Sequence, residues 1–227
     1  MIFKDVQKYA EINWKECLKS VTECSKAKKT KISLVRNETK IYCFDDISKT
    51  IYFNDNPSAS VDGVDFNEDE IVLVEYKSGF KEKITRDNYA NDYRSRCPET
   101  QSVCKYYWDL FFKLRDREKK ELISNLKLKA LDTYVTLEKN IFPNCDDTPK
   151  GKKLRLIIVI DADDVDDMED ALSDLSRKPT SKNNYFTKIK DALSRFKLRE
   201  DAFGNKYLYD SIEVYSVKRY SDLINTY

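Results

Sequence analysis

Asp62, Glu75 and Lys77 are the residues whose types and spacing best fit a chemical site. Glu75 and Lys77 close an apolar run of strand length, and Tyr76 stands between them. Side chains alternate faces along a strand, so Glu75 and Lys77 are expected to point to one side and Tyr76 to the other. A tight antiparallel turn across residues 67–70 would bring Asp62 beside Glu75 on the neighbouring strand.

Two carboxylates that converge in this way repel each other unless a cation lies between them. Mg²⁺ and Mn²⁺ prefer carboxylate oxygens, so Asp62 and Glu75 are predicted to bind one of these ions. Lys77 would project beside them, where an ammonium can orient a water molecule or meet the charge that develops on a phosphate. A solvent-facing pair of charges across two strands would give the same Glu-x-Lys pattern, and this alternative stays open.

The pattern resembles the PD-(D/E)XK nuclease superfamily, in which an acidic residue is followed, on the adjoining strand, by Glu-x-Lys. Asp62 takes the place of the first acid, Glu75 that of the second and Lys77 that of the lysine. Two features depart from the family: Val61 stands where proline is common, and no extra acid can be assigned on the first helix. The resemblance implies a nuclease that hydrolyses phosphodiester bonds of DNA, with RNA as the alternative, using Mg²⁺ or Mn²⁺.

The resemblance also implies roles for individual residues. The carbonyl of Tyr76 becomes an additional metal ligand beside Asp62 and Glu75, and Lys77 positions the attacking water. Members of the superfamily often carry a further basic or amide side chain on the helix after Glu-x-Lys, and Lys127 is the candidate here. Such scaffolds also serve as inactive binding modules, so a non-catalytic protein that binds nucleic acid or another protein is the alternative function.

Lys127 is chosen because of its place on an expected helix over residues 123–141. At about 100° per residue, Lys127 falls inside the apolar stripe of this helix, whereas Lys129 and Asp132 fall outside it. A lysine that faces the sheet costs free energy unless a carboxylate or phosphate meets it. A lysine that extends along the edge of the stripe into solvent is the other interpretation. The stripe comprises Ile123, Leu126, Ala130, Tyr134, Leu137 and Ile141.

A second acidic cluster follows a buried strand over residues 154–160. Asp161 and Asp163 stand where the strand ends, at the sheet edge where ligand crevices form. Together with Glu75 they resemble the Toprim domain, whose pattern is a strand-terminal Glu followed by Asp-x-Asp and whose chemistry is metal-dependent phosphotransfer. The glycine usual after the Toprim Glu is here Tyr76. Acidic residues that favour the start of a helix would also explain the cluster.

Two further observations limit the chemistry. The chain contains no histidine, which excludes Ser-His-Asp and Cys-His catalysis and histidine-ligated zinc. Its six cysteines include no Cys-x-x-Cys pair, so reduced cysteines are expected rather than a zinc site of four thiolates.

The expected elements make one α/β domain over residues 1–227, with a mixed central β-sheet flanked by helices. The resemblance adds that this fold is restriction-endonuclease-like, with a nuclease-like core over about residues 1–161 and further helices and a strand over 162–227. The elements are a helix over 4–29, a hairpin of strands 40–44 and 50–53, strands over 60–66 and 71–77, a helical segment over 99–141 with a break near 115–119, a strand over 154–160, helices over 161–177 and around 189–196, and a strand over 207–217.

Composition limits the partners. The 227 residues include 41 Lys and Arg against 40 Asp and Glu, which excludes a globally basic nucleic-acid coat but allows a local basic groove. No apolar run approaches the roughly 18 residues that span a membrane, and the first residues lack the apolar stretch of a signal peptide. We therefore predict a cytoplasmic protein that binds nucleic acid, DNA in the first instance, and has no membrane partner. A homodimer or a complex with a partner protein stays open.

Overall fold

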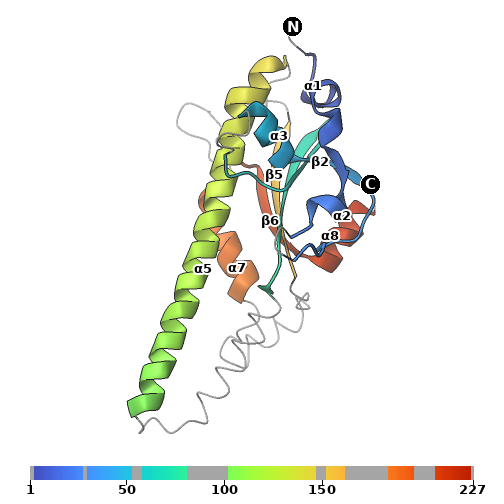
Figure 1. Ribbon diagram of the computed structural model, residues 1–227. Coiled ribbons are helices and arrows are strands. Elements are labelled where there is room, and N and C mark those ends of the chain that lie inside the picture. The colour runs from blue at the N-terminus through green and yellow to red at the C-terminus, as the bar shows by residue number, and fades with distance from the viewer. Residues whose placement is uncertain are drawn as a thin grey trace, which may run out of the picture.

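A computed structural model describes residues 3–27, 30–52, 58–80, 102–146, 152–161, 184–196 and 208–225. These residues form a six-stranded mixed sheet in the order β1-β2-β3-β4-β5-β6, with helices packed on it (Figure 1). The predicted class, an α/β fold with a mixed sheet flanked by helices, is therefore confirmed. The strands are β1 (Leu18–Ser20), β2 (Lys40–Cys43), β3 (Gly63–Phe66), β4 (Glu70–Lys77), β5 (Lys153–Ile160) and β6 (Ser211–Ser216).

The helices come between and after these strands. They are α1 (Val6–Asn13), α2 (Val21–Cys24), α3 (Phe44–Ile51), α5 (Ser102–Thr136), α7 (Asn184–Leu193) and α8 (Val217–Ile224), with short turns η1 (Lys15–Cys17), η2 (Leu137–Ile141), η3 (Phe142–Asn144) and η5 (Ser194–Phe196). None of the helices in the described part of the chain is long and apolar enough to cross a membrane.

The pairing of neighbouring strands changes once across the sheet, from antiparallel to parallel. β1 to β4 pair antiparallel, whereas β4, β5 and β6 run parallel to one another. The turn between β3 and β4 is closed by Asn67 N, which donates to the carbonyl of Glu70 at 2.9 Å. With Gly63 opposite Val74, this register places Asp62 beside the end of β4, as the sequence predicted.

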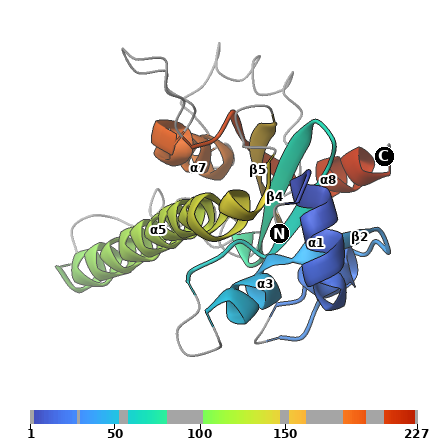
Figure 2. The same cartoon turned by 90° about the horizontal axis from the view of Figure 1, so that it is seen from above.

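The sheet separates two cores. Leu156 and Ile158 of β5 face the larger core, which is covered by α1, α3, α5 and α7. Ile157 and Val159 face the smaller core under α2 and α8. Figure 2 shows α5 and α7 on one side of β4 and β5 and α8 on the other. β5 is buried on both faces because it lies inside the parallel part of the sheet, which explains its continuous apolar run.

The single opening helix predicted over residues 4–29 is wrong. The helix α1 ends at Asn13, and residues 18–20 pair with β2 as strand β1. A new helix then starts at Ser20, whose hydroxyl accepts from the backbone N–H of Glu23 while the Glu23 carboxylate accepts from the backbone N–H of Ser20. This capping box is a signal for a helix start, and it marks a second helix inside the segment that apolar spacing alone predicts as one.

The predicted hairpin over 40–53 is also wrong in its second half. Residues 40–43 do form the strand β2, but residues 44–51 form helix α3. Phe44 and Ile47 are fully buried on one face of this helix, and Asp45 and Asp46 stand in its first turn, where carboxylates are favoured. The helical spacing of the buried residues therefore outweighed the β-propensity of individual side chains.

The remaining elements differ in smaller ways. α5 continues without a break through residues 115–119, and its first half projects beyond the sheet (Figure 1). The strands predicted around 60–66, 71–77, 154–160 and 207–217 and the helix around 189–196 are all present with shorter or shifted bounds, whereas α8 was not predicted. The helix predicted from residue 161 to 177 lies outside the described residues.

Replacing Leu156 by alanine tests the larger core. Leu156 is fully buried at the centre of β5, so Leu156→Ala should lower the free energy of unfolding by about 2–5 kcal/mol, because it removes apolar contacts and leaves a cavity. Urea denaturation followed by circular dichroism measures the change. Ile12→Ala is the control, because Ile12 is 68% exposed on α1, and it should stay within about 0.5 kcal/mol of the wild type.

Candidate functional site

Glu75 is the centre of the candidate site. It lies near the end of β4, points into the larger core on the side of α5, and is completely buried. Lys129 Nζ contacts Glu75 Oε2 at 2.8 Å. Lys77 Nζ forms an ion pair with Glu75 Oε1 at 2.7 Å, and Oε1 accepts no hydrogen bond from the described residues. A buried carboxylate thus lies between two ammonium groups.

Asp62 joins the same cluster from the residue before β3. Its Oδ1 lies 3.2 Å from Lys129 Nζ, and its Oδ2 accepts a hydrogen bond of 2.8 Å from the backbone N–H of Tyr76. One ammonium nitrogen, that of Lys129, therefore bridges the two carboxylates. The structure brings Asp62, Glu75 and Lys77 together as the strand pairing predicted, and the cation found between the carboxylates belongs to the chain itself.

Lys129, and not Lys127, makes these contacts. Thr133 and Thr136 are fully buried on the flank of α5 that also carries Lys129. Thr133 Oγ1 accepts from the backbone N–H of Val61 at 3.0 Å, which fixes this flank of α5 against the residue before Asp62. The prediction that Lys127 faces the sheet counted only apolar residues as buried, so these two threonines were not part of the predicted buried face. Counting small polar residues as buried would have identified Lys129.

Tyr76 lies on the opposite face of the sheet, as the alternation predicted. Its ring is buried in the smaller core, and its hydroxyl lies 3.0 Å from that of Tyr220 on α8. The side chain thus lies on the other face of the sheet from Glu75, and Tyr76 hydrogen-bonds Asp62 through its backbone N–H. The role of the Tyr76 carbonyl as a metal ligand stays a prediction.

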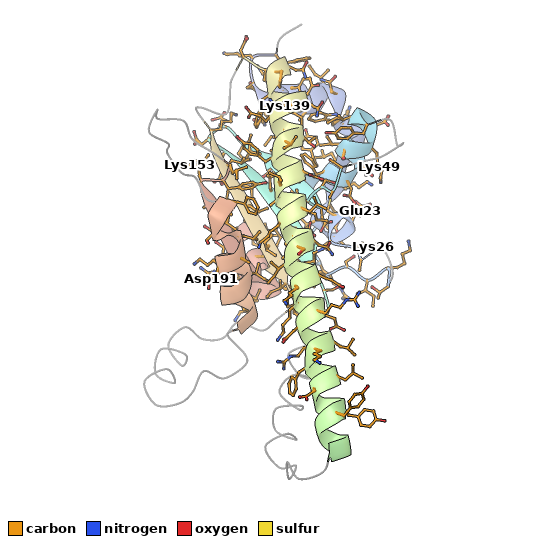
Figure 3. All side chains as sticks on the ribbon, turned by 90° about the vertical axis from the view of Figure 1, so that its left-hand side faces the viewer. Glu23, Lys26, Lys49, Lys139, Lys153 and Asp191 are labelled. Atoms are coloured by element: carbon orange, nitrogen blue, oxygen red, sulfur yellow. The ribbon has the colours of Figure 1, made fainter. Side chains whose placement is uncertain are left out.

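A cavity of about 540 Å³ opens beside this cluster. Asp62, Lys77 and Lys129 line it, whereas Glu75 lies behind the two lysines. Its lining includes five lysines: Lys19, Lys26, Lys49, Lys77 and Lys129. It also includes four carboxylates: Glu23, Asp45, Asp46 and Asp62. Figure 3 labels Glu23, Lys26 and Lys49, which lie along one side of α5.

Burial determines the electrostatics of the cluster. Loss of solvent around Glu75, together with the negative charge of Asp62, raises the pKa of Glu75 to about 7 although Lys129 and Lys77 oppose the change. Burial by itself would lower the pKa of Lys129, but the attraction of Glu75 and Asp62 outweighs it and the pKa is raised. Lys129 therefore stays charged at neutral pH.

The residues present fit a divalent cation in part. Asp62 and Glu75 supply two carboxylates that face one position, and Glu75 Oε1 is a buried oxygen without a hydrogen bond. Mg²⁺ is commonly held by one or two carboxylates and completed by water and substrate phosphates. However, the described residues contain no group of three or more Cys, Asp or Glu arranged around a metal position. Lys129 Nζ would have to leave the position between the carboxylates.

Asp161, of the second acidic cluster, contacts the loop after β4. Its two carboxylate oxygens accept hydrogen bonds of 2.6 Å from the backbone N–H groups of Gly79 and Phe80. Gly79 has φ +89°, a conformation that favours glycine, so the carboxylate stabilises a turn that few other residues could form. Asp163 lies outside the described residues, and the Toprim interpretation therefore keeps only one described aspartate.

Comparison of the chain with models of protein families, with curated proteins and with solved structures found no match. The resemblance to the PD-(D/E)XK superfamily therefore depends on the residues and geometry of Asp62, Glu75 and Lys77 alone.

The raised pKa of Glu75 predicts a pH-dependent stability. The ordinary pKa is 4.5 and the folded-state pKa is about 7, so the folded state binds a proton more tightly than the unfolded state. Glu75 therefore contributes stability that is complete below pH 4.5 and is lost as the pH rises through 7. The loss should be on the order of 3 kcal/mol, measured as the free energy of unfolding between pH 4.5 and 7.5.

The variant Glu75→Gln isolates this contribution, because glutamine does not titrate. The difference in unfolding free energy between wild type and variant should change with pH, whereas Glu68→Gln, at an exposed turn, should leave the profile of the wild type unchanged. A parallel pH profile for wild type and Glu75→Gln would contradict the assignment.

Proposed function

We propose that the protein is a metal-dependent nuclease with a restriction-endonuclease-like core that hydrolyses phosphodiester bonds of DNA, with RNA as the alternative. The observation that carries the proposal is the convergence of Asp62, just before β3, and Glu75, on β4, upon one ammonium group, that of Lys129, with Lys77 at the surface of the adjacent cavity. Two carboxylates and a lysine in this arrangement match the chemistry that the Asp…Glu-x-Lys pattern implies.

The order of the elements supports the proposal. A first helix, α1, is followed by three antiparallel strands, β2 to β4, then by the crossover helix α5 and by β5 parallel to β4. This is the helix, three strands, helix, strand order of the family core. In this comparison β1, α2 and α3 are additions to that core, and β6 extends the sheet beyond β5.

In the proposed reaction each residue has a distinct role. Asp62 and Glu75 would hold the cation, which would supply Lewis-acid activation of the phosphate and of the attacking water. Lys77 Nζ, at the cavity surface, donates a hydrogen bond to the attacking water and so orients it toward phosphorus. Lys129 Nζ, displaced from the carboxylates, neutralises negative charge on the phosphate.

Exposed side chains on the projecting half of α5 support the proposal that the substrate is a nucleic acid. Tyr106 and Tyr107 are 66% and 64% exposed, and Arg117 is exposed on the same helix. Exposed aromatic rings can stack on unpaired bases, and cations neutralise backbone phosphates. These side chains lie on the helix that also carries Lys129.

Cleavage assays test the proposal. Purified protein with Mn²⁺ or Mg²⁺ should cut single- or double-stranded DNA, and removal of the metal with EDTA should abolish cutting. Lys77→Met should lower the rate by about 10²–10⁴-fold, the usual contribution of a group that positions or transfers a proton. Glu75→Ala should abolish cleavage, with Asp163→Ala tested in parallel and folding of each variant checked by circular dichroism.

The outcomes separate the proposed function from its alternatives. Loss of cleavage in Glu75→Ala but not in Asp163→Ala supports the nuclease site, whereas loss in both favours Toprim-type chemistry. A wild type that cuts neither DNA nor RNA with any divalent metal would contradict enzymatic activity.

A non-catalytic binding module is the second candidate, and one observation favours it. Each carboxylate oxygen of Asp62 and Glu75 already faces a lysine or a backbone N–H, so the cluster is neutralised within the chain. Such a network can hold α5 on the sheet without any chemistry. Under this alternative the protein would bind nucleic acid or a partner protein with no dependence on metal.

Two lysines on α5 provide a matched test of the cation position. Because Lys129 bridges both carboxylates, Lys129→Met should free them and tighten the binding of Mn²⁺ by roughly tenfold or more, which is about 1.4 kcal/mol. Lys127→Met removes the same charge two residues away and should bind Mn²⁺ as the wild type does. Isothermal titration calorimetry without substrate measures the Mn²⁺ affinity of both variants. Equal affinities would refute the idea that Lys129 and the metal ion compete for the two carboxylates.

A further inference from the structure

Two free thiols, those of Cys24 and Cys43, lie in the wall of the cavity that Asp62 and Lys77 also line. Cys24 is the last residue of α2, and Cys43 is the last residue of β2. The proposed function uses neither of them.

The two thiols lie on the same face of the sheet. Ile41, two residues before Cys43 on β2, belongs to the smaller core, and alternation along the strand directs Cys43 to the same side. Cys24 packs against that core. Both residues line the same cavity, and the interaction between their side chains is the largest influence on the pKa of each.

The surroundings make the two sulfur atoms chemically unequal. The neighbouring Cys24 side chain lowers the pKa of Cys43, although burial and the Asp46 carboxylate oppose the change. Cys43 is also the N-cap residue of α3, where the helix dipole favours a thiolate. The pKa of Cys24 is raised by its interaction with Cys43 and by burial. Cys43 is therefore the nucleophile and Cys24 the thiol that retains its proton.

The other described cysteines lack these features. Cys17 and Cys145 are buried, as Cys43 is, but neither lines the cavity, and the Cys145 thiol donates to the carbonyl of Ile141 at 3.6 Å. They provide internal controls, because they share the chain but not the environment of the pair.

We propose that Cys24 and Cys43 are a redox-modification site that reacts with a small disulfide of the glutathione type and closes to a reversible disulfide in the cavity wall. The Cys43 thiolate attacks one sulfur of glutathione disulfide, forms a mixed disulfide and releases one glutathione thiolate. Cys24 then loses its proton and attacks the Cys43 sulfur, which releases the second glutathione. The two protons of the cysteines end on the two glutathione molecules, and two electrons pass from the protein to the oxidant.

The bond would join the end of α2 to the residue that precedes α3. α2 borders the cavity through Glu23 and Cys24, and α3 borders it through Asp46 and Lys49. Asp46 already pairs with Lys49 and with Lys19 of β1. The reaction therefore changes the wall of the cavity next to Asp62. The inference does not depend on nuclease activity, because the disulfide is detected in the protein itself.

The experiment uses the full chain in buffers with a rising ratio of oxidised to reduced glutathione. After alkylation of free thiols and proteolysis, mass spectrometry should find the Cys24 and Cys43 peptides cross-linked, with the loss of two thiols per chain. Dithiothreitol should restore both thiols. The same treatment of the chain carrying Cys97→Ser and Cys104→Ser excludes cross-links made by those two cysteines.

Single variants test the order of the steps. Cys24→Ser should accumulate the mixed disulfide of Cys43 with glutathione, whereas Cys43→Ser should leave Cys24 largely unmodified. Cys17→Ser should still form the cross-link. The proposal is overturned if Cys24 and Cys43 stay reduced at every ratio, if they cross-link only in urea, or if Cys17 or Cys145 reacts equally fast.

Discussion

The structure depends on how one buried carboxylate is neutralised. Glu75 has no exposure to solvent, and a charge in that position is costly unless opposite charges meet it. Lys77 meets it from the same strand and Lys129 from α5, while Asp62 shares Lys129 from the adjacent strand. The arrangement therefore ties β3, β4 and α5 to one another, and any chemistry at this point must rearrange a network that also holds the fold together.

Much of the site could be predicted from the sequence, because alternation and a short turn determine it. Glu75 and Lys77 share a face and Asp62 lies beside them, since a tight turn at residues 67–70 fixes the register of β3 and β4. The position of β5 could also be predicted, because its continuous apolar run is typical of a strand that is buried on both faces in a parallel part of a sheet. The contact of Lys129 with the two carboxylates could not be predicted from the apolar stripe of α5, because the buried residues beside Lys129 on that helix are threonines.

The errors in the first 53 residues have a common physical origin. Apolar spacing identified which residues are buried but not which hydrogen bonds their backbone makes. Val6 and Val21 are both buried, yet a strand pairing at residues 18–20 and a capping box at Ser20 divide the segment between them. Residues 44–51 combine the same helical spacing with β-branched and aromatic side chains, and their backbone forms a helix. In both segments the hydrogen-bond partners of the backbone determine the secondary structure.

The alternation along β4 gives the length of one turn a particular importance. Glu75 and Tyr76 are neighbours in the chain, but one lies with the ammonium groups and the other with the hydroxyl of Tyr220. A single residue inserted between β3 and β4 would slide the strand by one position and invert its faces, exposing an aromatic ring to the lysines and driving an acid into the tyrosine layer. The loop between these strands thus acts as a spacer that keeps Glu75 beside its lysines and Tyr76 beside Tyr220.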